Sequence, residues 1–315
     1  MPLHPQVEEY LRRLSATGFP ALHTFTPEQA RAGMRRLAAA TGTAVEPVAA
    51  VTDRTVPTRA GDVPVRVYRP EGTGALPVVV FFHGGGFALG GIDTHDGLAR
   101  AIANASGGIV VSVDYPLAPE HRYPAAPDAA FDATAWVARH AADFGGDPSR
   151  VAVAGDSAGG NLAAVVALRA RDEGGPDLAF QLLIYPDLDF RRENRSITEL
   201  AGRYGNISRE TQFWFMDLYL ADESQRRDPR VSPLLEDDLT GLPPALVVTA
   251  EYDALRDEGE QYGARLRAAG VAATTSRYDG MIHEFCRHPF DSARDAVEEA
   301  GAALRAAFHA QVGAP

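Results

Sequence analysis

The chain opens with two segments in which apolar residues recur at helical spacing. Between Val7 and Leu14 the apolar positions lie three or four residues apart, as they would on one face of a helix. The segment Thr26–Gln29 has the composition of a helix start, because threonine can cap the helix, proline suits its first position, and glutamine completes a capping box. The pattern therefore predicts two short helices before residue 45.

From about residue 47 the pattern changes to that of strands. Val63–Tyr68 alternates like a half-buried strand, and Leu76–Phe82 is apolar throughout, like a strand buried on both faces. Strands and helices then alternate, which predicts an α/β fold with a mostly parallel central sheet flanked by helices. The further strands are expected at Ile109–Val113, Val151–Ala154, Gln181–Tyr185, Ala245–Ala250 and Ala273–Tyr278, and the further helices at Ala126–His140, Ala158–Arg171, Glu258–Ala269 and Ala293–Ala310.

The interval 189–228 breaks this alternation. It is charged at first and then carries an aromatic segment around Phe213, Trp214, Phe215 and Tyr219, which indicates a helix. We interpret the interval as an insertion that packs on the N-terminal helices and caps the sheet. The expected organisation is an N-terminal part of the cap at 1–45, a sheet domain at 46–188 and 229–315, and the cap insertion at 189–228.

Composition and charge narrow the class of protein. Of the 315 residues 45% are hydrophobic and 23% charged, which is ordinary for a globular protein. The net charge of −12 argues against nucleic acid and anionic membrane surfaces as partners. The longest strongly apolar run, Ala75–Phe82, is far shorter than the roughly 20 residues of a membrane helix, so no membrane insertion is expected. The N-terminal segment has no signal-peptide core, and the single cysteine, Cys286, cannot form an internal disulfide, so we expect a cytoplasmic protein.

The strongest chemical signal is a serine in the pentapeptide Gly155-Asp156-Ser157-Ala158-Gly159. It follows an apolar strand and precedes a helical pattern, which is the context of a nucleophile elbow. Glycines suit both flanks, because this tight turn leaves no room for side chains. The alternative, a Gly/Ser-rich turn without catalytic function, is much less favoured in this context.

A second signal is the glycine run His83-Gly84-Gly85-Gly86-Phe87, again after a buried strand. Acyl transfer places negative charge on the carbonyl oxygen, and preorganised backbone N–H groups can stabilise it. The amide of Ala158 would complete such an oxyanion hole. A Walker-type phosphate loop would need a Gly-Lys-Ser/Thr sequence, which does not follow, and the dinucleotide spacing fails at Leu89.

A nucleophilic serine needs a base and an orienting carboxylate, in the chain order Ser, acid, His for this fold. Asp253 comes just after one late strand and His283 just after the next, so both fall at the carboxyl edge of the sheet. Glu251 and Asp257 stay open as competing acids. Asp253 alone could be a helix cap, and a lone histidine is more often structural.

A metal site is the weaker interpretation of the same histidine. His283 and His288 are five residues apart, whereas a zincin helix needs two histidines four apart on one face, and a proline follows at once. Cys286 is expected to be a buried thiol. We therefore predict no metal and no cofactor.

Several motifs together resemble one known family. HGGGF, GDSAGGN, DALRDEG and GMIHEF, with Tyr115–Ala126 and Asp228–Leu234, are similar to segments of the hormone-sensitive-lipase-type esterases, the bacterial family IV of the α/β-hydrolases. The resemblance covers most of residues 63–310 in the same order. It implies an α/β-hydrolase fold with a helical cap, and carboxylester hydrolysis without a cofactor.

The resemblance also implies roles for particular residues. Ser157, Asp253 and His283 would form the catalytic triad. The oxyanion hole would draw on Gly84, Gly85 and Gly86 with Ala158, and Gly85 and Gly86 are favoured. The substrate pocket is expected to include Phe87, Asp156, Phe213 and Trp214, although the last two could equally be the buried face of a helix.

The expected partner is a small ester of short to medium acyl chain, and dimers are common in the family, so a homodimer is allowed. The chain departs from the usual family sequence at Pro116, Ala254 and Glu284. Glu284 puts a carboxylate beside the base, where it could raise the pKa of His283 or simply face solvent. Two other functions stay open, namely hydrolysis of an amide or carbamate, and a non-catalytic receptor on the same fold.

Overall fold

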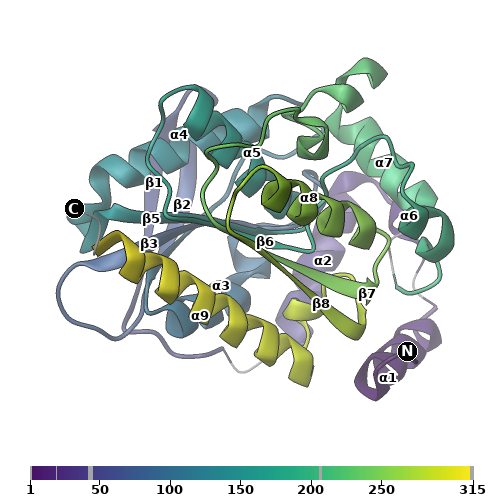
Figure 1. The fold of residues 1–315 in the computed structure, drawn as a ribbon. Helices are drawn as coiled ribbons and strands as arrows, with labels where there is room; N and C mark the ends of the chain where they lie inside the picture. Colours follow the sequence, from purple (N-terminus) through teal and green to yellow (C-terminus); the bar gives the residue numbers. More distant parts are fainter. Residues whose placement is uncertain (1, 19, 42–44, 206–207, 313–315) are drawn as a thin grey trace.

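The centre of the molecule is an eight-stranded sheet (Figure 1). The computed structural model describes residues 2–18, 20–41, 45–205 and 208–312. In space the strands follow the order β1-β2-β4-β3-β5-β6-β7-β8. The strands are β1 (Ala50–Thr58), β2 (Gly61–Arg69), β3 (Leu76–Phe82), β4 (Ile109–Val113), β5 (Gly146–Asp156), β6 (Phe180–Ile184), β7 (Ala245–Tyr252) and β8 (Ala273–Ile282).

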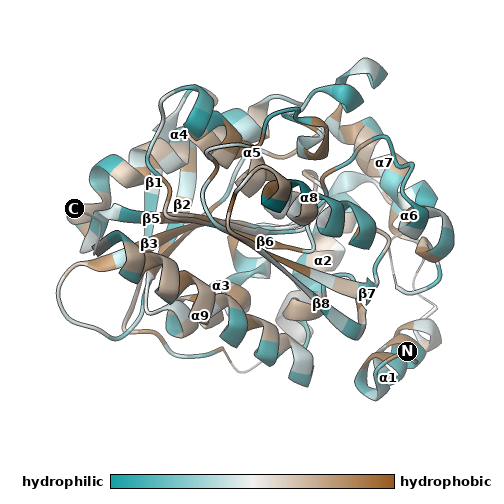
Figure 2. Cartoon of the chain, viewed as in Figure 1, coloured by the Kyte–Doolittle hydropathy of each residue, from teal (hydrophilic) through white to brown (hydrophobic). Residues whose placement is uncertain are grey.

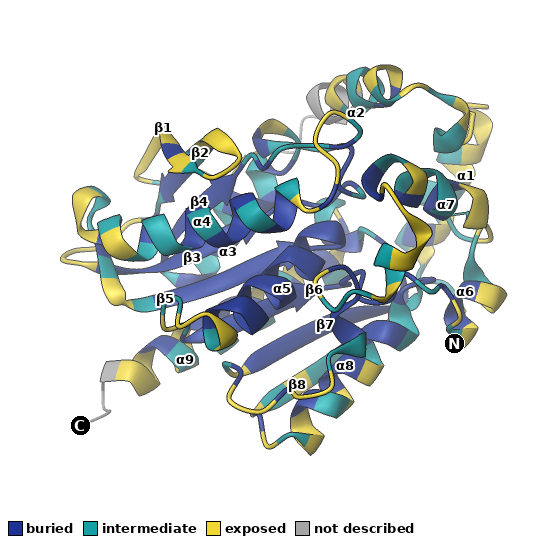
Figure 3. Ribbon diagram, turned by 90° about the horizontal axis from the view of Figure 1, so that it is seen from above, coloured by how far each residue is buried: buried dark blue, intermediate teal, exposed yellow. Residues whose placement is uncertain are grey.

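The sheet is mostly parallel, which confirms the predicted fold class. Only β1 and β2 run antiparallel to their neighbours, and the strands from β4 to β8 pair in parallel. The central strands β3, β4, β6 and β7 are apolar almost throughout, because helices cover both faces of the sheet there and exclude water from them, whereas the edge strand β8 is largely polar. Figure 2 shows this apolar centre, and Figure 3 shows the same strands buried while β1 is largely exposed.

Two hydrophobic cores lie on the two faces of the sheet. On one face α4, α5 and α8 pack against the strands, and on the other α3 and α9 do so (Figure 1). The helices are α1 (Pro5–Ala16), α2 (Pro27–Thr41), α3 (Asp96–Ser106), α4 (Ala125–His140), α5 (Ala158–Asp172), α6 (Arg195–Leu200), α7 (Arg209–Tyr219), α8 (Arg256–Ala268) and α9 (Asp291–Val312).

Most predicted elements are confirmed to within a few residues, including the two N-terminal helices. The capping box forms as expected, because Thr26 N–H donates to Gln29 Oε1 at 3.0 Å and Gln29 N–H donates to Thr26 Oγ1 at 3.3 Å. Among the strands and α-helices, three were not predicted, namely β1, α3 and α6. In β1 only Val56 is buried, so the strand shows no alternation that a sequence pattern could reveal. In α3 the buried residues from Leu98 to Ala103 do recur at helical spacing, and this signal was available.

The N-terminal segment and the 195–219 helices lie at the same end of the molecule, beyond the carboxyl ends of the parallel strands (Figure 1). His23 Nδ1 lies 3.1 Å from Thr211 Oγ1 of α7, which joins the two segments. Arg31 of α2 donates to the carbonyl of Ala88 at 2.7 Å and forms a bidentate pair with Glu120. These contacts agree with a two-part cap. The domain limits at 45, 188 and 228 stay predictions, and residues 42–44 and 206–207 lie outside the described part of the chain.

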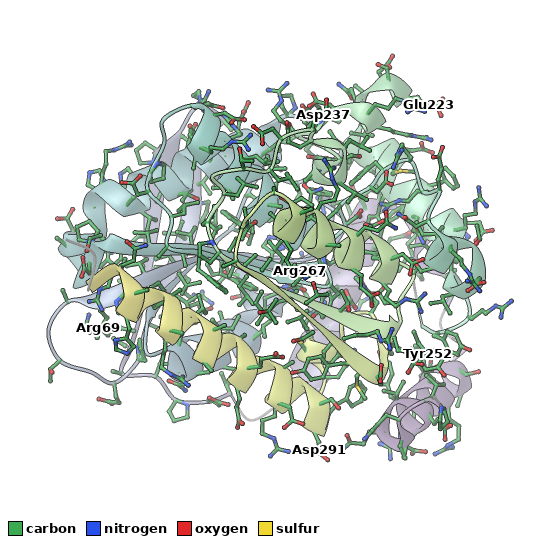
Figure 4. The ribbon with its side chains drawn as sticks, in the orientation of Figure 1. Arg69, Glu223, Asp237, Tyr252, Arg267 and Asp291 are labelled. Atoms are coloured by element: carbon green, nitrogen blue, oxygen red, sulfur yellow. The ribbon has the colours of Figure 1, made fainter. Side chains whose placement is uncertain are left out.

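Charged side chains cover the outside of the molecule, as the acidic composition requires. Figure 4 shows Glu223 and Asp291 projecting outward at different ends of the structure. Within the described ranges, none of the helices is long and apolar enough to cross a membrane.

Candidate active site

The proposed nucleophile lies at the junction of β5 and α5. Ser157 takes φ = 55°, an unusual backbone conformation for a residue with a side chain, directly after the last residue of β5. The flanking glycines are required here. A Cβ on Gly155 would lie 2.1 Å from the carbonyl oxygen of Gly159, and one on Gly159 would lie 1.9 Å from that of Phe82. The segment is therefore a strained strand-to-helix turn, which is the geometry of a nucleophile elbow.

Ser157, His283 and Asp253 form a continuous hydrogen-bonded series. Ser157 Oγ lies 2.9 Å from His283 Nε2, and His283 Nδ1 lies 2.7 Å from Asp253 Oδ2. All three residues are buried, and Asp253 Oδ1 also accepts the backbone N–H of Leu255 at 2.9 Å. A carboxylate only accepts hydrogen bonds, so the imidazole hydrogen is on Nδ1, and Nε2 is free to accept the serine proton.

The sheet topology explains why residues so far apart in the sequence meet. Ser157 follows β5, Asp253 follows β7 and His283 follows β8, each at the first position beyond its strand. These strands are parallel, so their carboxyl ends share one edge of the sheet.

The competing acids are engaged elsewhere. Glu251 Oε2 accepts the backbone N–H of Gly280 at 2.8 Å. Asp257 Oδ2 accepts the backbone N–H of Ser196 at 2.8 Å, while its other oxygen pairs with Arg256. Of the three carboxylates considered from the sequence, Asp253 is the one bonded to His283.

The surroundings of His283 raise its pKa above the usual value. Burial lowers the pKa of His283, but the charge and hydrogen bond of Asp253, together with the charge of Glu284, outweigh burial and raise it. Glu284 itself takes φ = 63° and pairs with Arg287 at 3.1 Å. Its side chain is 33% exposed, so both alternatives considered for Glu284 hold in part.

The glycine loop after β3 approaches the serine from the neighbouring strand. Gly85 (φ = 124°) and Gly86 (φ = 59°) take conformations that favour glycine, and a Cβ on Gly85 would lie 2.3 Å from the carbonyl oxygen of Leu89. Within the part of the chain that the structure describes, the N–H groups of Gly85 and Gly86 donate to no protein acceptor. They are therefore free to bind an oxyanion, as is expected of an oxyanion hole.

Phe87 and Asp156, which we expected in the substrate pocket, lie beneath the loop. Phe87 is 1% exposed and stacks on Tyr219 of α7, with ring centroids 4.0 Å apart. Asp156 has no exposed surface, and its Oδ1 accepts the N–H of Gly84 at 2.8 Å. In the structure these side chains hold the loop in place and are shielded from solvent.

Three aromatic residues of α7, Phe213, Trp214 and Phe215, are partly exposed. The guanidinium groups of Arg209 and Arg226 each lie 5.6 Å from the centroid of the Phe213 ring, and Trp214 packs against Phe215. Phe215, which the sequence analysis did not assign to the pocket, lies directly over the glycine loop. A Cβ built on Gly86 would come within 2.3 Å of its ring. The run of adjacent aromatic residues was visible in the sequence. Which of them faces the glycine loop depends on the orientation of α7, and the sequence did not show this.

The remaining predictions concern metals and the cysteine. Over the described residues, no group of three or more His, Cys, Asp or Glu side chains could hold a metal ion. The ring of His288 instead packs at a tilt against that of Tyr10, with centroids 4.4 Å apart. Cys286 is a buried free thiol, as expected, and burial raises its pKa well above the usual value.

A small pocket opens beside the proposed base. Its lining includes Tyr10 of α1, Tyr204 from the segment after α6, and His283 with Glu284. Both tyrosines come from the segments assigned to the cap, so the cap contributes to the surroundings of the base. A larger cavity, about 520 Å3, lies between α2, the β1–β2 hairpin and residues 90–94, and no triad residue lines it.

The site has the arrangement of a serine hydrolase. A serine, an imidazole and a carboxylate lie in series at the carboxyl edge of an α/β sheet, beside a glycine loop with free amides. Residues 79–287 match a protein family whose members have the alpha/beta hydrolase fold. The chain belongs to this family, in its hormone-sensitive-lipase-type branch, which confirms the resemblance.

Characterised proteins resemble this chain over most of its length. The carboxylesterase NlhH of Mycobacterium tuberculosis is 45% identical over 288 residues, which are 89% of this chain and 89% of NlhH. The carboxylic ester hydrolase LipN of the same species is 48% identical over 244 residues, 75% of this chain but only 64% of LipN. The structure of an esterase from the archaeon Pyrobaculum calidifontis has a TM-score of 0.93 and 42% identity, covering 97% of this chain and 99% of the archaeal one.

Proposed function

We propose that the protein is a carboxylesterase that hydrolyses esters through an acyl-enzyme on Ser157. The observation that carries this proposal is the unbroken series from Ser157 Oγ through His283 to Asp253, with steps of 2.9 Å and 2.7 Å. The names of the relatives NlhH and LipN support the same activity. This hydrogen-bonded series also counts against a receptor that has lost a catalytic group.

The geometry suggests the following mechanism. Ser157 Oγ attacks the ester carbonyl while His283 Nε2 takes its proton, and Asp253 stabilises the imidazolium that forms. The N–H groups of Gly85, Gly86 and Ala158 stabilise the oxyanion. The imidazolium then protonates the leaving alcohol, and water, activated by the same imidazole, hydrolyses the acyl-enzyme.

We further propose that the substrates have short to medium acyl chains. Phe215 lies over Gly86 and restricts the space beside the proposed oxyanion hole. Among the large hydrophobic residues that the structure describes, only Val45 and Val51 are exposed, so the surface offers little apolar area for an emulsified fat.

The test is hydrolysis of p-nitrophenyl esters from acetate to palmitate, with Ser157→Ala in parallel. Ser112→Ala is a matched control, because Ser112 is also a buried serine but lies on β4 away from the triad. Activity that peaks at short chains, disappears in Ser157→Ala and persists in Ser112→Ala is the expected result. Activity only on long chains would contradict the size preference.

The preferred leaving group distinguishes an esterase from the alternative, a hydrolase of amides or carbamates. An amide or carbamate hydrolase would cleave p-nitroanilides or aryl carbamates faster than the matched esters. A folded wild-type protein that cleaves no ester would contradict the proposed function itself.

A cytoplasmic location and a homodimer stay predictions. Cell fractionation tests the first, and sedimentation equilibrium of the purified chain tests the second.

A further inference from the structure

A buried carboxylate and two buried imidazoles lie beneath the glycine loop, and the mechanism above does not use them. Asp156 and His83 have no exposed surface, and His95 is 1% exposed. Burying a charged carboxylate is costly unless partners hold it, so the contacts of Asp156 indicate what it does.

The first contact of Asp156 follows from the sheet register. Phe82 of β3 pairs with Gly155 of β5, so the chain leaves both strands side by side, with Gly84 next to Asp156. Gly84 N–H donates to Asp156 Oδ1 at 2.8 Å. The two residues are so close that a Cβ on Gly84 would lie 2.7 Å from Asp156 Oδ2. The carboxylate thus supports the backbone of the first loop glycine directly.

The second contact of Asp156 is His95, the residue just before α3. His95 Nε2 lies 3.4 Å from Asp156 Oδ1. His95 Nδ1 lies 2.9 Å from Thr94 Oγ1, and the Thr94 hydroxyl donates to the carbonyl of Gly91 at 2.9 Å. Since that hydroxyl has a single hydrogen, it accepts from His95, so Nδ1 carries a hydrogen, and the contact of Nε2 with Asp156 is an ion pair when the ring carries its second hydrogen there. His95 therefore connects Asp156 to the far end of the loop.

The two ends of the loop are packed against each other above this pair. A Cβ on Gly90 would lie 2.4 Å from the carbonyl oxygen of Gly84 and 2.7 Å from His83 Nδ1. His83 Nδ1 donates to that same carbonyl at 2.8 Å, and Tyr115 OH donates to the carbonyl of His83 at 2.7 Å. The loop is thus closed at its base, where small shifts of Gly84 would move Gly85 and Gly86.

We propose that Asp156 and His95 are positioning residues for the oxyanion hole. Asp156 holds the entry of the loop through Gly84 N–H, and His95 holds Asp156 while connecting it to the exit of the loop. This inference rests on the proposed function, because it assigns the pair to an oxyanion that esterase chemistry would create.

The charges around the pair agree with this role. Burial raises the pKa of Asp156, but His95, Arg287 and the Gly84 N–H outweigh burial and lower it, so Asp156 is ionised at neutral pH. Burial and the neighbouring His95 lower the pKa of His83 to about 3, so His83 is neutral. An ionised Asp156 is a stronger acceptor for Gly84 N–H than a neutral amide would be.

The test compares Asp156→Asn, Asp156→Ala and His95→Asn with the control Asp114→Asn. Asp114 Oδ1 lies 3.9 Å from His83 Nε2, so the control removes a carboxylate near the loop without touching Gly84. Two readouts are needed: kcat and KM on p-nitrophenyl acetate, and affinity for an alkyl trifluoromethyl ketone, whose adduct with serine places an oxyanion in the hole. The parent methyl ketone serves as the control ligand.

Loss of one oxyanion donor costs about 10²–10³ in kcat, so a displaced loop should cost roughly tenfold in Asp156→Asn and roughly a hundredfold in Asp156→Ala. KM and methyl ketone affinity should change little, while trifluoromethyl ketone affinity falls by the same factor as kcat/KM. The double variant with His95→Asn should be no worse than Asp156→Asn alone, because both residues act through one path.

Three results would overturn the inference. Asp156→Asn could match Asp114→Asn, or kcat could fall while trifluoromethyl ketone affinity stays unchanged. If neither Asp156 variant folds, His95→Asn decides, and wild-type affinity for the trifluoromethyl ketone would count against the pair. By contrast, failure of the wild-type protein to hydrolyse any ester would refute the proposed function itself.

Discussion

Replacing Asp253 by asparagine should disable the base, His283, by moving its imidazole hydrogen from Nδ1 to Nε2. Asp253 Oδ1 accepts the N–H of Leu255 at 2.9 Å, so an asparagine must place its oxygen there. Its NH2 group then occupies the site of Oδ2, 2.7 Å from His283 Nδ1. A donor at that site favours the imidazole with hydrogen on Nε2, which cannot accept the proton of Ser157.

The expected loss is large. The analogous change in a Ser-His-Asp protease lowers kcat about 10⁴-fold, which corresponds to about 5.4 kcal/mol of transition-state free energy. We expect a loss of this order in kcat/KM for p-nitrophenyl acetate, with an unchanged melting temperature to within a few degrees.

Asp257→Asn is the matched control, because Asp257 lies four residues further on and bonds to Ser196 and Arg256 instead. It should keep activity to within about threefold, since surface and helix-start changes of this kind cost little. If Asp257→Asn abolished hydrolysis while Asp253→Asn retained more than a tenth of it, our assignment of the acid would be refuted.

Three further outcomes are expected. The raised pKa of His283 means that the neutral base is lost as pH falls, so kcat/KM should decline on the acid side with a midpoint above about 6.5; a midpoint below that value would contradict the surroundings described. Arg192 donates to the buried carboxylate of Asp187 through two hydrogen bonds of 2.7 Å and 2.8 Å. Arg192→Met leaves this carboxylate without its partner, so the free energy of unfolding should fall by roughly 3–5 kcal/mol. A fall of less than about 1 kcal/mol in denaturant unfolding would refute this expectation. Phe215→Ala should widen the space over Gly86 and shift the chain-length optimum of p-nitrophenyl esters upward, and an unchanged optimum would mean that the ring does not bound the pocket.

The meeting of Ser157, Asp253 and His283 could be predicted from the sequence because each residue lies just beyond the end of a strand. Ser157 and Asp253 follow apolar segments, whereas the strand before His283 is largely polar, and the parallel sheet brings all three residues to one edge. The choice of Asp253 over Glu251 and Asp257 was harder. It depends on which side chain faces His283, and this is decided by local turns that periodicity does not describe.

The substrate side of the site was less accessible from sequence. Phe87 was expected in the substrate pocket, and the structure places it 1% exposed against Tyr219 from a distant segment. His95 gave no signal at all, since its role depends on the register between β3 and β5 and on the start of α3. Such contacts come from tertiary packing, which residue patterns along the chain do not encode directly.

Covalent labelling of the nucleophile tests the central claim most directly. Diethyl p-nitrophenyl phosphate should transfer one phosphoryl group per chain to Ser157, releasing one equivalent of p-nitrophenol, and ester hydrolysis should fall in proportion to the label. Intact mass and peptide mapping give the stoichiometry and the position, and Ser157→Ala should stay unlabelled. Hydrolysis that persists after Ser157 is fully labelled, or a label on another residue that abolishes it, would contradict the account.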